Sequence, residues 1–219
     1  MRHMKKALAL LLALAMLLGC VTVTAFAEDD CPSKGFSDVP PEGHWAHAGI
    51  DFMVKNGYMN GVGGDKFSPD GIVTRAQLVT ILYRLAGSPD TEFKGTFTDV
   101  PDGRWYSLPI EWAAANAIVN GVGEGRFAPT RPVTREQLAV MLCNYASYRK
   151  YPTPDRADLG KFPDAGSVSP WARDALSWAN AAGLVNGVRS GGADYLRPQG
   201  NATRAQVAAI LHRFCETVR

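Results

Sequence analysis

Hydrophobic residues recur at helical spacing in a first kind of segment, which the chain presents three times. In the first of them the apolar face runs from Trp45 through Ile50, and Gly57 is placed to end the helix. In the last, "SPWARDALSWANAAG", Ser169 suits the N-cap and Pro170 the first helical position. The pattern predicts a short amphipathic helix in each of the three places.

A second kind of segment begins at a Thr-Arg pair, and it also occurs three times. In "VTRAQLVTIL" a capping box formed by Thr74 and Gln77 precedes a stripe of leucine and isoleucine that would face a core. The equivalent helices are predicted to start at Thr134 and Thr203. The chain therefore predicts two helices per unit, joined by Gly- and Pro-rich turns that each contain one apolar plug residue, namely Phe67, Phe127 and Leu196.

Spacings between the motifs establish that these units are internal repeats. An Asn-Gly pair follows fifteen residues after the tryptophan of each opening motif, and a proline stands five residues before each Thr-Arg threonine. A unit of about 60 residues is marginal alone, so we expect one body built by all three copies. The expected organisation is a signal peptide (1–27), a leader (28–35), copy 1 (36–90), copy 2 (91–150) and copy 3 (151–219).

The N-terminus has the pattern of a secretory signal peptide. Basic residues precede an uncharged run from Ala7 to Leu18, and an A-x-A motif ends at Ala27, where we expect cleavage. A lipoprotein box at "LLGC" and an uncleaved membrane anchor are the alternatives that remain open. No later segment is apolar enough to span a bilayer, so no span is expected in the mature chain.

Charge and cysteine content narrow the function further. The formal charge is +2, from 23 basic and 21 acidic residues. Three of the basic residues belong to the predicted signal peptide, so the mature chain carries 20 minus 21, or −1, which argues against a nucleic-acid partner. Cys143 and Cys215 fit apolar helical patterns and are expected to be buried, while Cys31 is a candidate free thiol. His44 and His47 have no evident third ligand, so no metal site is expected.

The repeated motifs resemble S-layer homology domains, three in tandem. The resemblance rests on the Phe-x-Asp-Val opening, the tryptophan, the Asn-Gly-x-Gly turn, the Phe-x-Pro and the Thr-Arg-Ala-Gln helix start. The family pattern usually ends in Thr-Arg-Ala-Glu, whereas Gln77, Gln137 and Gln206 stand here in place of the acid. A capping box accepts either residue.

The resemblance implies a fold and a function. The fold is mainly α, with three two-helix repeats forming a pseudo-threefold, three-pronged spindle around a central bundle of the Thr-Arg helices. Grooves between the prongs would bind a secondary cell-wall polymer, often one carrying pyruvate ketals on amino sugars. The implied role is to anchor a secreted protein non-covalently on a bacterial cell surface, without a cofactor, and a cargo or partner protein would supply any activity.

The arginines of the Thr-Arg pairs are the first candidate ligand-binding residues. Arg75, Arg135 and Arg204 each occupy the first helical position, where the helix dipole disfavours a cation by about 0.3–1 kcal/mol. A helix N-terminus with free N–H groups is an anion site, and an adjacent arginine can clamp a carboxylate. The alternative is that each arginine pairs with a nearby acid. The recurring aspartates are candidate partners and further ligand-binding candidates: Asp38, Asp99 and Asp164.

Further candidates are the tryptophans Trp45, Trp105 and Trp171, which can stack on a sugar, although helical spacing favours burial in the core. Lys66 and Arg126 precede the plug residue of copies 1 and 2 and would add charge to a groove, where copy 3 has Tyr195. No nucleophile, metalloprotease or phosphate-loop motif is present. A non-enzymatic binding module is therefore favoured, with a protein-binding adaptor and a carbohydrate-active enzyme as the alternatives.

Overall fold

The computed structural model describes residues 31–218, so the predicted signal peptide and its alternatives lie outside the described residues. The described chain is mainly helical, as expected, and none of its helices is long and apolar enough to cross a membrane. The longer elements are α2 (His47–Lys55), α3 (Arg75–Leu85), α4 (Ser107–Ala115), α5 (Arg135–Tyr148), α6 (Arg173–Ala181) and α7 (Arg204–Thr217), with strands β1 (Val188–Ser190) and β2 (Ala193–Tyr195). Short 3₁₀ helices are η1 (Pro32–Gly35), η2 (Leu159–Lys161), η3 (Ala165–Ser167) and η4 (Pro170–Ala172).

The Thr-Arg helices α3, α5 and α7 begin where the sequence predicts, and the capping box is the reason. In α3 the Thr74 hydroxyl accepts from the Gln77 backbone N–H at 3.3 Å, and the Gln77 side-chain oxygen accepts from the Thr74 N–H at 2.8 Å. The same reciprocal pair starts α5 and α7. All three capping boxes are thus confirmed with glutamine in the acid's position.

The first helices of the copies, α2, α4 and α6, start without a side-chain cap. Gly57 follows α2 with φ +67°, the left-handed conformation expected of a helix stop. In copy 3 Pro170 begins the 3₁₀ turn η4, which leads into α6. The side chain of Ser169 does not cap this turn, because it bonds to Glu136 of copy 2 instead.

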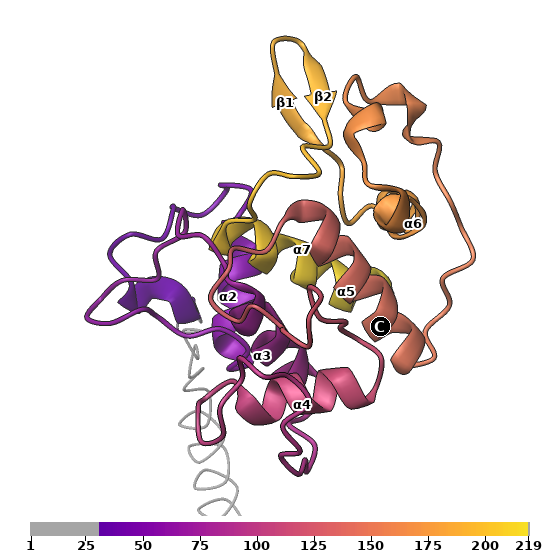
Figure 1. The fold of residues 1–219 in the computed structure, drawn as a ribbon. Coiled ribbons are helices and arrows are strands. Elements are labelled where there is room, and N and C mark those ends of the chain that lie inside the picture. The colour runs from indigo at the N-terminus through magenta and orange to yellow at the C-terminus, as the bar shows by residue number, and fades with distance from the viewer. Residues whose placement is uncertain (1–30, 219) are drawn as a thin grey trace, which may run out of the picture. The chain divides into compact units, whose positions relative to one another are not determined.

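Helices of different copies pack in a cyclic order (Figure 1). The first helix of copy 2, α4, packs against α3 of copy 1, and the first helix of copy 3, α6, packs against α5 of copy 2. The order closes because α2 of copy 1 packs against α7 of copy 3, at the other end of the described chain. One hydrophobic cluster contains residues of all three copies, and residues 32–219 form a single compact unit.

Three backbone hydrogen bonds close a ring at the centre of this cyclic order. The Val73 N–H donates to the Ala202 carbonyl at 3.0 Å, Ala202 donates to Val133 at 3.0 Å, and Val133 donates back to Val73 at 2.9 Å. Each residue stands two positions before a Thr-Arg arginine, and each is buried. The copies are therefore joined by their backbones as well as by their apolar faces.

Copy 3 differs from its siblings in the turn between its helices. Its insertion forms the antiparallel hairpin β1–β2, in which Val188 pairs with Tyr195 and Ser190 with Ala193. Cys143 and Cys215 differ from the prediction because both are only half-buried.

Candidate functional site

The three Thr-Arg arginines are almost completely buried, and each reaches from its own copy to the inter-helix turn of the next. Arg204 of copy 3 donates from Nε to the Phe67 carbonyl at 2.8 Å and from its second terminal nitrogen to the Asn60 carbonyl at 2.6 Å. Its guanidinium also lies 4.4 Å from the centroid of the Phe67 ring. Arg204 thus ties copy 3 to copy 1 and completes the cyclic order.

Arg75 and Arg135 make the same link between the other copies. Arg75 donates from Nε to the Phe127 carbonyl at 2.8 Å and from a terminal nitrogen to Asn120, and its guanidinium lies 4.5 Å from the centroid of the Phe127 ring. Arg135 donates from Nε to the Leu196 carbonyl at 2.8 Å. Exposed fractions are 4%, 5% and 8% for Arg75, Arg135 and Arg204.

The recurring aspartates bind the backbone of the same inter-helix turns, at the N–H groups of the plug residue and of the residue after it. The Asp99 carboxylate accepts from the Phe127 and Ala128 N–H groups at 2.7 and 2.8 Å. Ala128 has φ +59°, so the carboxylate stabilises a backbone conformation that is unfavourable for alanine. Asp38 and Asp164 hold the equivalent turns of copies 1 and 3 in the same way. We call the aspartate, the plug peptide and the arginine of the preceding copy a turn frame.

The turn frame differs from two expectations of the sequence analysis, a direct pair between arginine and aspartate and a helix N-terminus with free N–H groups. Arginine and aspartate bond the same plug residue, Arg75 at its carbonyl and Asp99 at its N–H, in place of a direct ion pair. The N-terminus of α3 is also not free, because the N–H groups of Arg75 and Ala76 donate to the carbonyls of Arg131 and Pro129 at 2.9 and 3.0 Å. The first N–H groups of α5 and α7 are bonded likewise. An anion would therefore meet the guanidinium edge rather than the helix end.

Burial lowers the pKa of all three arginines, Arg75, Arg135 and Arg204. For Arg75 the pKa falls to about 10, chiefly because of burial and next because Arg131 carries a like charge, while Asp99 opposes the shift. The side chain remains a cation at neutral pH. A second positive charge close to a buried one is unfavourable unless an anion is bound.

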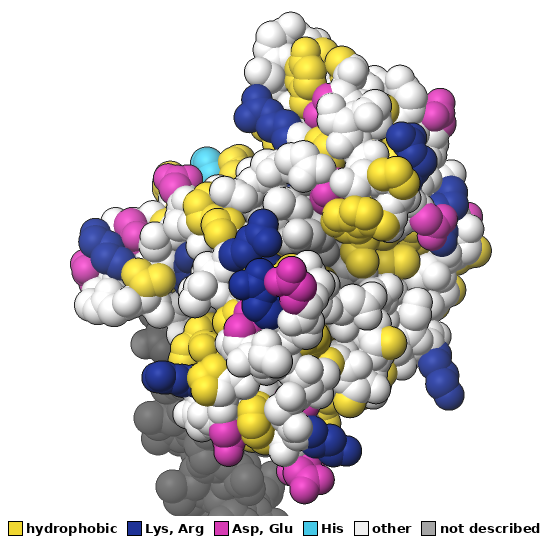
Figure 2. Space-filling model, viewed as in Figure 1, with side chains coloured by type: hydrophobic (Ala, Val, Ile, Leu, Met, Phe, Trp, Pro, Cys, Tyr) yellow, Lys and Arg dark blue, Asp and Glu magenta, His cyan; other side chains and the backbone are white. Residues whose placement is uncertain are grey.

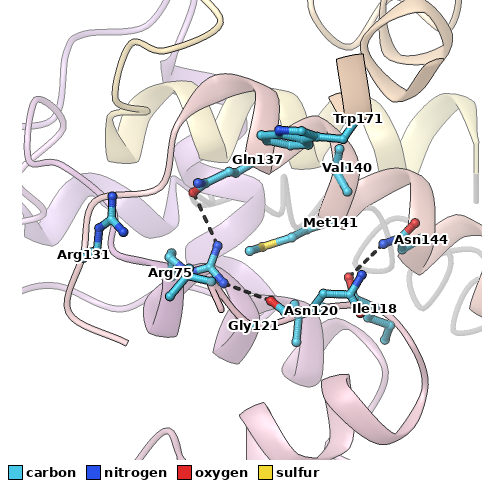
Figure 3. Close-up of a pocket in the computed structure, with 12 residues that line it drawn as sticks. Arg75, Ile118, Asn120, Gly121, Arg131, Gln137, Val140, Met141, Asn144 and Trp171 are labelled. Atoms are coloured by element: carbon cyan, nitrogen blue, oxygen red, sulfur yellow. Dashed lines mark hydrogen bonds between the residues drawn. The ribbon is translucent and has the colours of Figure 1, made fainter. Parts of the chain in front are cut away.

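A cavity of about 520 Å³ opens beside Arg75, and we call it groove 2 (Figure 3). The turn of copy 2 contributes one wall, α5 contributes a second, and the Trp171 ring of copy 3 lies across from the turn. All three copies therefore contribute to the cavity. Its lining residues are Arg75, Ile118, Val119, Asn120, Gly121, Val122, Arg131, Gln137, Val140, Met141, Asn144 and Trp171.

Groove 2 is cationic and polar at one side and apolar at the other. None of the described residues that line it is acidic. Gln137, which replaces the usual family acid, accepts from Arg75 at 3.4 Å, so no carboxylate of the described lining faces Arg75 and Arg131. Such a cavity suits a ligand that carries both an anionic group and an apolar face.

The three opening tryptophans are exposed, so the expectation that helical spacing buries them is wrong. Trp45, Trp105 and Trp171 expose 61%, 60% and 57% of their surface. All three precede their helices, Trp45 and Trp105 on the turns before α2 and α4 and Trp171 in η4 before α6. On the face seen in Figure 2, exposed hydrophobic side chains lie next to Lys and Arg side chains.

Lys66 and Arg126 take no part in groove 2. Lys66 bonds the Ser37 hydroxyl at 2.5 Å, and Arg126 lies 3.7 Å from Glu124. Among the groove residues that the sequence analysis missed are Arg131, Met141 and Asn144, and it also missed Glu136, which bonds Ser169 beside the groove. A position-by-position comparison of the three copies would have singled out these residues.

The fold and site define a three-repeat helical module, closed head to tail, with a ligand-sized groove formed by all three repeats. The chain belongs to the S-layer homology domain family, whose family model matches residues 35–79, 96–139 and 161–208. The three matches confirm three tandem repeats. Family membership indicates a protein associated with the cell wall and cell surface.

The chain is similar to one segment of several much longer proteins. It is 32% identical to an amylopullulanase of Thermoanaerobacterium thermosulfurigenes, over 84% of this chain and 10% of that protein. It is 29% identical to the exoglucanase XynX of Acetivibrio thermocellus, over 84% of this chain and 16% of that protein. It is 30% identical to the surface-layer 125 kDa protein of Lysinibacillus sphaericus, over 80% of this chain and 14% of that protein. The chain thus spans a small part of each relative.

Proposed function

We propose that this protein is a non-enzymatic anchor that binds an acidic secondary cell-wall polysaccharide on the bacterial surface, with a pyruvylated sugar as the acidic unit. The cyclic order of the helix pairs is then that of a three-pronged spindle, with a ligand groove between neighbouring prongs. A cargo or partner protein would be held on the wall by the same contact. Relatives that are named as glucan-degrading enzymes and as surface-layer proteins fit a module that is shared between different activities.

The observation that carries the proposal is the pairing of Arg75 and Arg131 in a groove whose described lining has no acid. Three N–H groups of Arg75 are bonded to described protein atoms, which leaves two of its five for a ligand carboxylate. A charge-assisted hydrogen bond there contributes about 1.5–3 kcal/mol. Trp171 would cover the apolar face of the sugar ring.

Sedimentation with isolated cell wall tests this function. The protein should pellet with intact wall, stay in solution after the polymer has been extracted, and stay in solution after mild acid has removed the ketal. Binding that survives extraction but requires another wall protein would favour an adaptor. Release of reducing sugar would favour an enzyme, and loss of the ketal without effect would overturn the pyruvylated ligand.

A further inference from the structure

Copy 2 departs from both other copies at four positions where those two agree. The comparison covers Gly71–Leu85, Arg131–Tyr145 and Gly200–Phe214, aligned on the Thr-Arg arginine. Copies 1 and 3 have glycine, alanine, isoleucine and arginine where copy 2 has Arg131, Glu136, Met141 and Asn144. Three of these four residues line groove 2, and the fourth bonds the turn that carries Trp171. Four scattered differences therefore converge on one site.

Asn144 leaves space in groove 2 because its side chain is short. Its side-chain amide donates to the Ile118 carbonyl at 3.2 Å. The equivalent arginines make the same bond in their own copies, Arg84 to Tyr58 at 3.2 Å and Arg213 to Leu184 at 2.9 Å. Since an asparagine is shorter and narrower than an arginine, copy 2 keeps the bond and leaves free the volume that a guanidinium occupies in the others.

Arg131 adds a second cation to groove 2, at the opposite end from Asn144 and next to Arg75 (Figure 3). The equivalent residues are Gly71 and Gly200. A Cβ on either would lie close to the buried arginine of the preceding copy, 3.3 Å from the Arg204 Cδ and 3.8 Å from the Arg135 Cδ. Copy 2 accepts an arginine at this tight position, next to the like charge of Arg75. That repulsion is relieved when an anion lies between the two guanidinium groups.

Glu136 positions the segment of copy 3 that brings Trp171 to groove 2. It is buried, with an exposed fraction of 2%. Its carboxylate accepts from the Ser169 N–H at 3.1 Å, from the Ser169 hydroxyl at 3.0 Å and from the Gln199 amide at 2.7 Å. Ser169 directly precedes Pro170 and Trp171, so these bonds fix the turn on which the Trp171 ring stands. The alanines at this position in copies 1 and 3 cannot make them.

We propose that groove 2 is the principal ligand groove of the protein and takes a whole acidic sugar residue, with Asn144, Arg131 and Glu136 as the residues that determine this. Asn144 makes room for the sugar ring, Arg131 joins Arg75 in binding its carboxylate, and Glu136 is a positioning residue that acts through Trp171. The inference rests on the proposed function, since it ranks the grooves of an acidic-polysaccharide binder.

The test replaces each of these residues by the one that both siblings carry, which the fold accommodates in the equivalent place. The probe is a synthetic pyruvylated amino sugar, titrated calorimetrically into the protein, with the ketal-free sugar as the ligand control. Asn144→Arg should lower affinity about tenfold or more by filling the pocket, and Arg131→Gly about three- to tenfold by removing one charged bond. Lys150→Ala removes a positive charge at the far end of α5 and should leave affinity unchanged.

The positioning role of Glu136 has its own readout. Glu136→Ala should weaken binding and reduce the shift that the sugar causes in the Trp171 indole N–H resonance, which Trp171→Phe assigns. Glu136→Gln keeps an acceptor for Ser169 and should restore most of that shift, whereas a purely stability-related role would leave the shift of the folded fraction unaltered.

Two results overturn the inference without touching the proposed function. One is wild-type affinity in Asn144→Arg. The other is a larger loss of sugar affinity in folded Arg135→Ala than in Asn144→Arg, which would assign the principal groove to copy 3. If the wild-type protein binds neither the wall nor the sugar, the proposed function itself fails.

Discussion

The inter-helix turns of copies 2 and 3 are stabilised by the same kind of turn frame, but the arginine of the preceding copy makes different contacts in each. In copy 2 the buried Arg75 bonds two backbone carbonyls and lies over the Phe127 ring. In copy 3 the equivalent Arg135 bonds one carbonyl, that of Leu196, which offers no ring. Both turns nevertheless adopt the same left-handed residue after the plug, Ala128 and Arg197. The frame therefore needs only one carbonyl, one carboxylate and one arginine.

This difference indicates that the fold depends on the backbone contacts of the turn frame, whereas a binding site depends on the side chains around it. The frame acts on backbone atoms, so the side chains around it are free to vary from copy to copy. Copy 2 uses this freedom to open a groove, and copy 3 uses it to insert the hairpin β1–β2.

The largest expected effect is on stability. Arg75→Ala should lower the free energy of unfolding by about 3–4 kcal/mol, because it strands two carbonyls and leaves a cavity under Phe127. Arg135→Ala should cost about 2 kcal/mol, since it loses one such bond and no ring contact. Urea unfolding followed by far-UV circular dichroism measures both. Equal losses would mean that the ring and the second carbonyl contribute nothing, and Lys150→Ala, at an exposed residue that follows α5, serves as the neutral control.

Next in size is the loss of the carboxylate. Asp99→Ala should cost about 2 kcal/mol, because the Phe127 and Ala128 N–H groups lose their acceptors in a part-buried turn. Asp164→Ala should cost about half as much, because Arg197 is exposed and its N–H can bond water. The same urea titration ranks them, and a larger loss for Asp164→Ala would contradict this account of the frame.

The helices could be predicted from the sequence, but the partners of the buried arginines could not. Fixed spacings and capping boxes were enough to predict the helices, the repeat number and the shared core, because those depend on local hydrogen bonds and on apolar periodicity. The partner of Arg75 could not be predicted, since it is a carbonyl of the next copy, and no sequence pattern marks a backbone acceptor. Exposure of the tryptophans was misjudged for a related reason, because each stands on the turn before its helix rather than on the helix face.

A smaller effect is expected on ligand binding. Trp171→Ala should reduce the affinity for the pyruvylated sugar by about 1–2 kcal/mol through lost stacking area. Trp45→Ala should reduce monosaccharide affinity by less, since Trp45 is not part of groove 2. Isothermal titration calorimetry of both variants with the pyruvylated sugar measures the two affinities. Similar losses would indicate that the grooves are equivalent and would weaken the case for a principal one.

The smallest predicted effect concerns acid stability, and it contrasts the turn frames of copies 1 and 3. Burial alone would raise the pKa of Asp38, but hydrogen bonds from the Phe67 and Ser68 N–H groups, with the nearby Lys66, bring the net shift below the usual value. A folded-state pKa below the unfolded one gives stability that is fully present above about pH 5 and is lost as pH falls through the folded value. Lys66→Ala should therefore shift acid unfolding slightly toward higher pH.

Copy 3 offers the matched control, because Tyr195 takes the place of Lys66 and brings no positive charge to its own frame. Tyr195→Ala should leave the acid midpoint where it is, while Asp38→Asn should flatten the dependence of melting temperature on pH below about pH 4. Melting temperatures measured from pH 7 down to pH 3 test all three variants. An acid midpoint in Lys66→Ala that is identical to that of the wild type would leave the backbone N–H groups of the frame as the cause of the low Asp38 pKa.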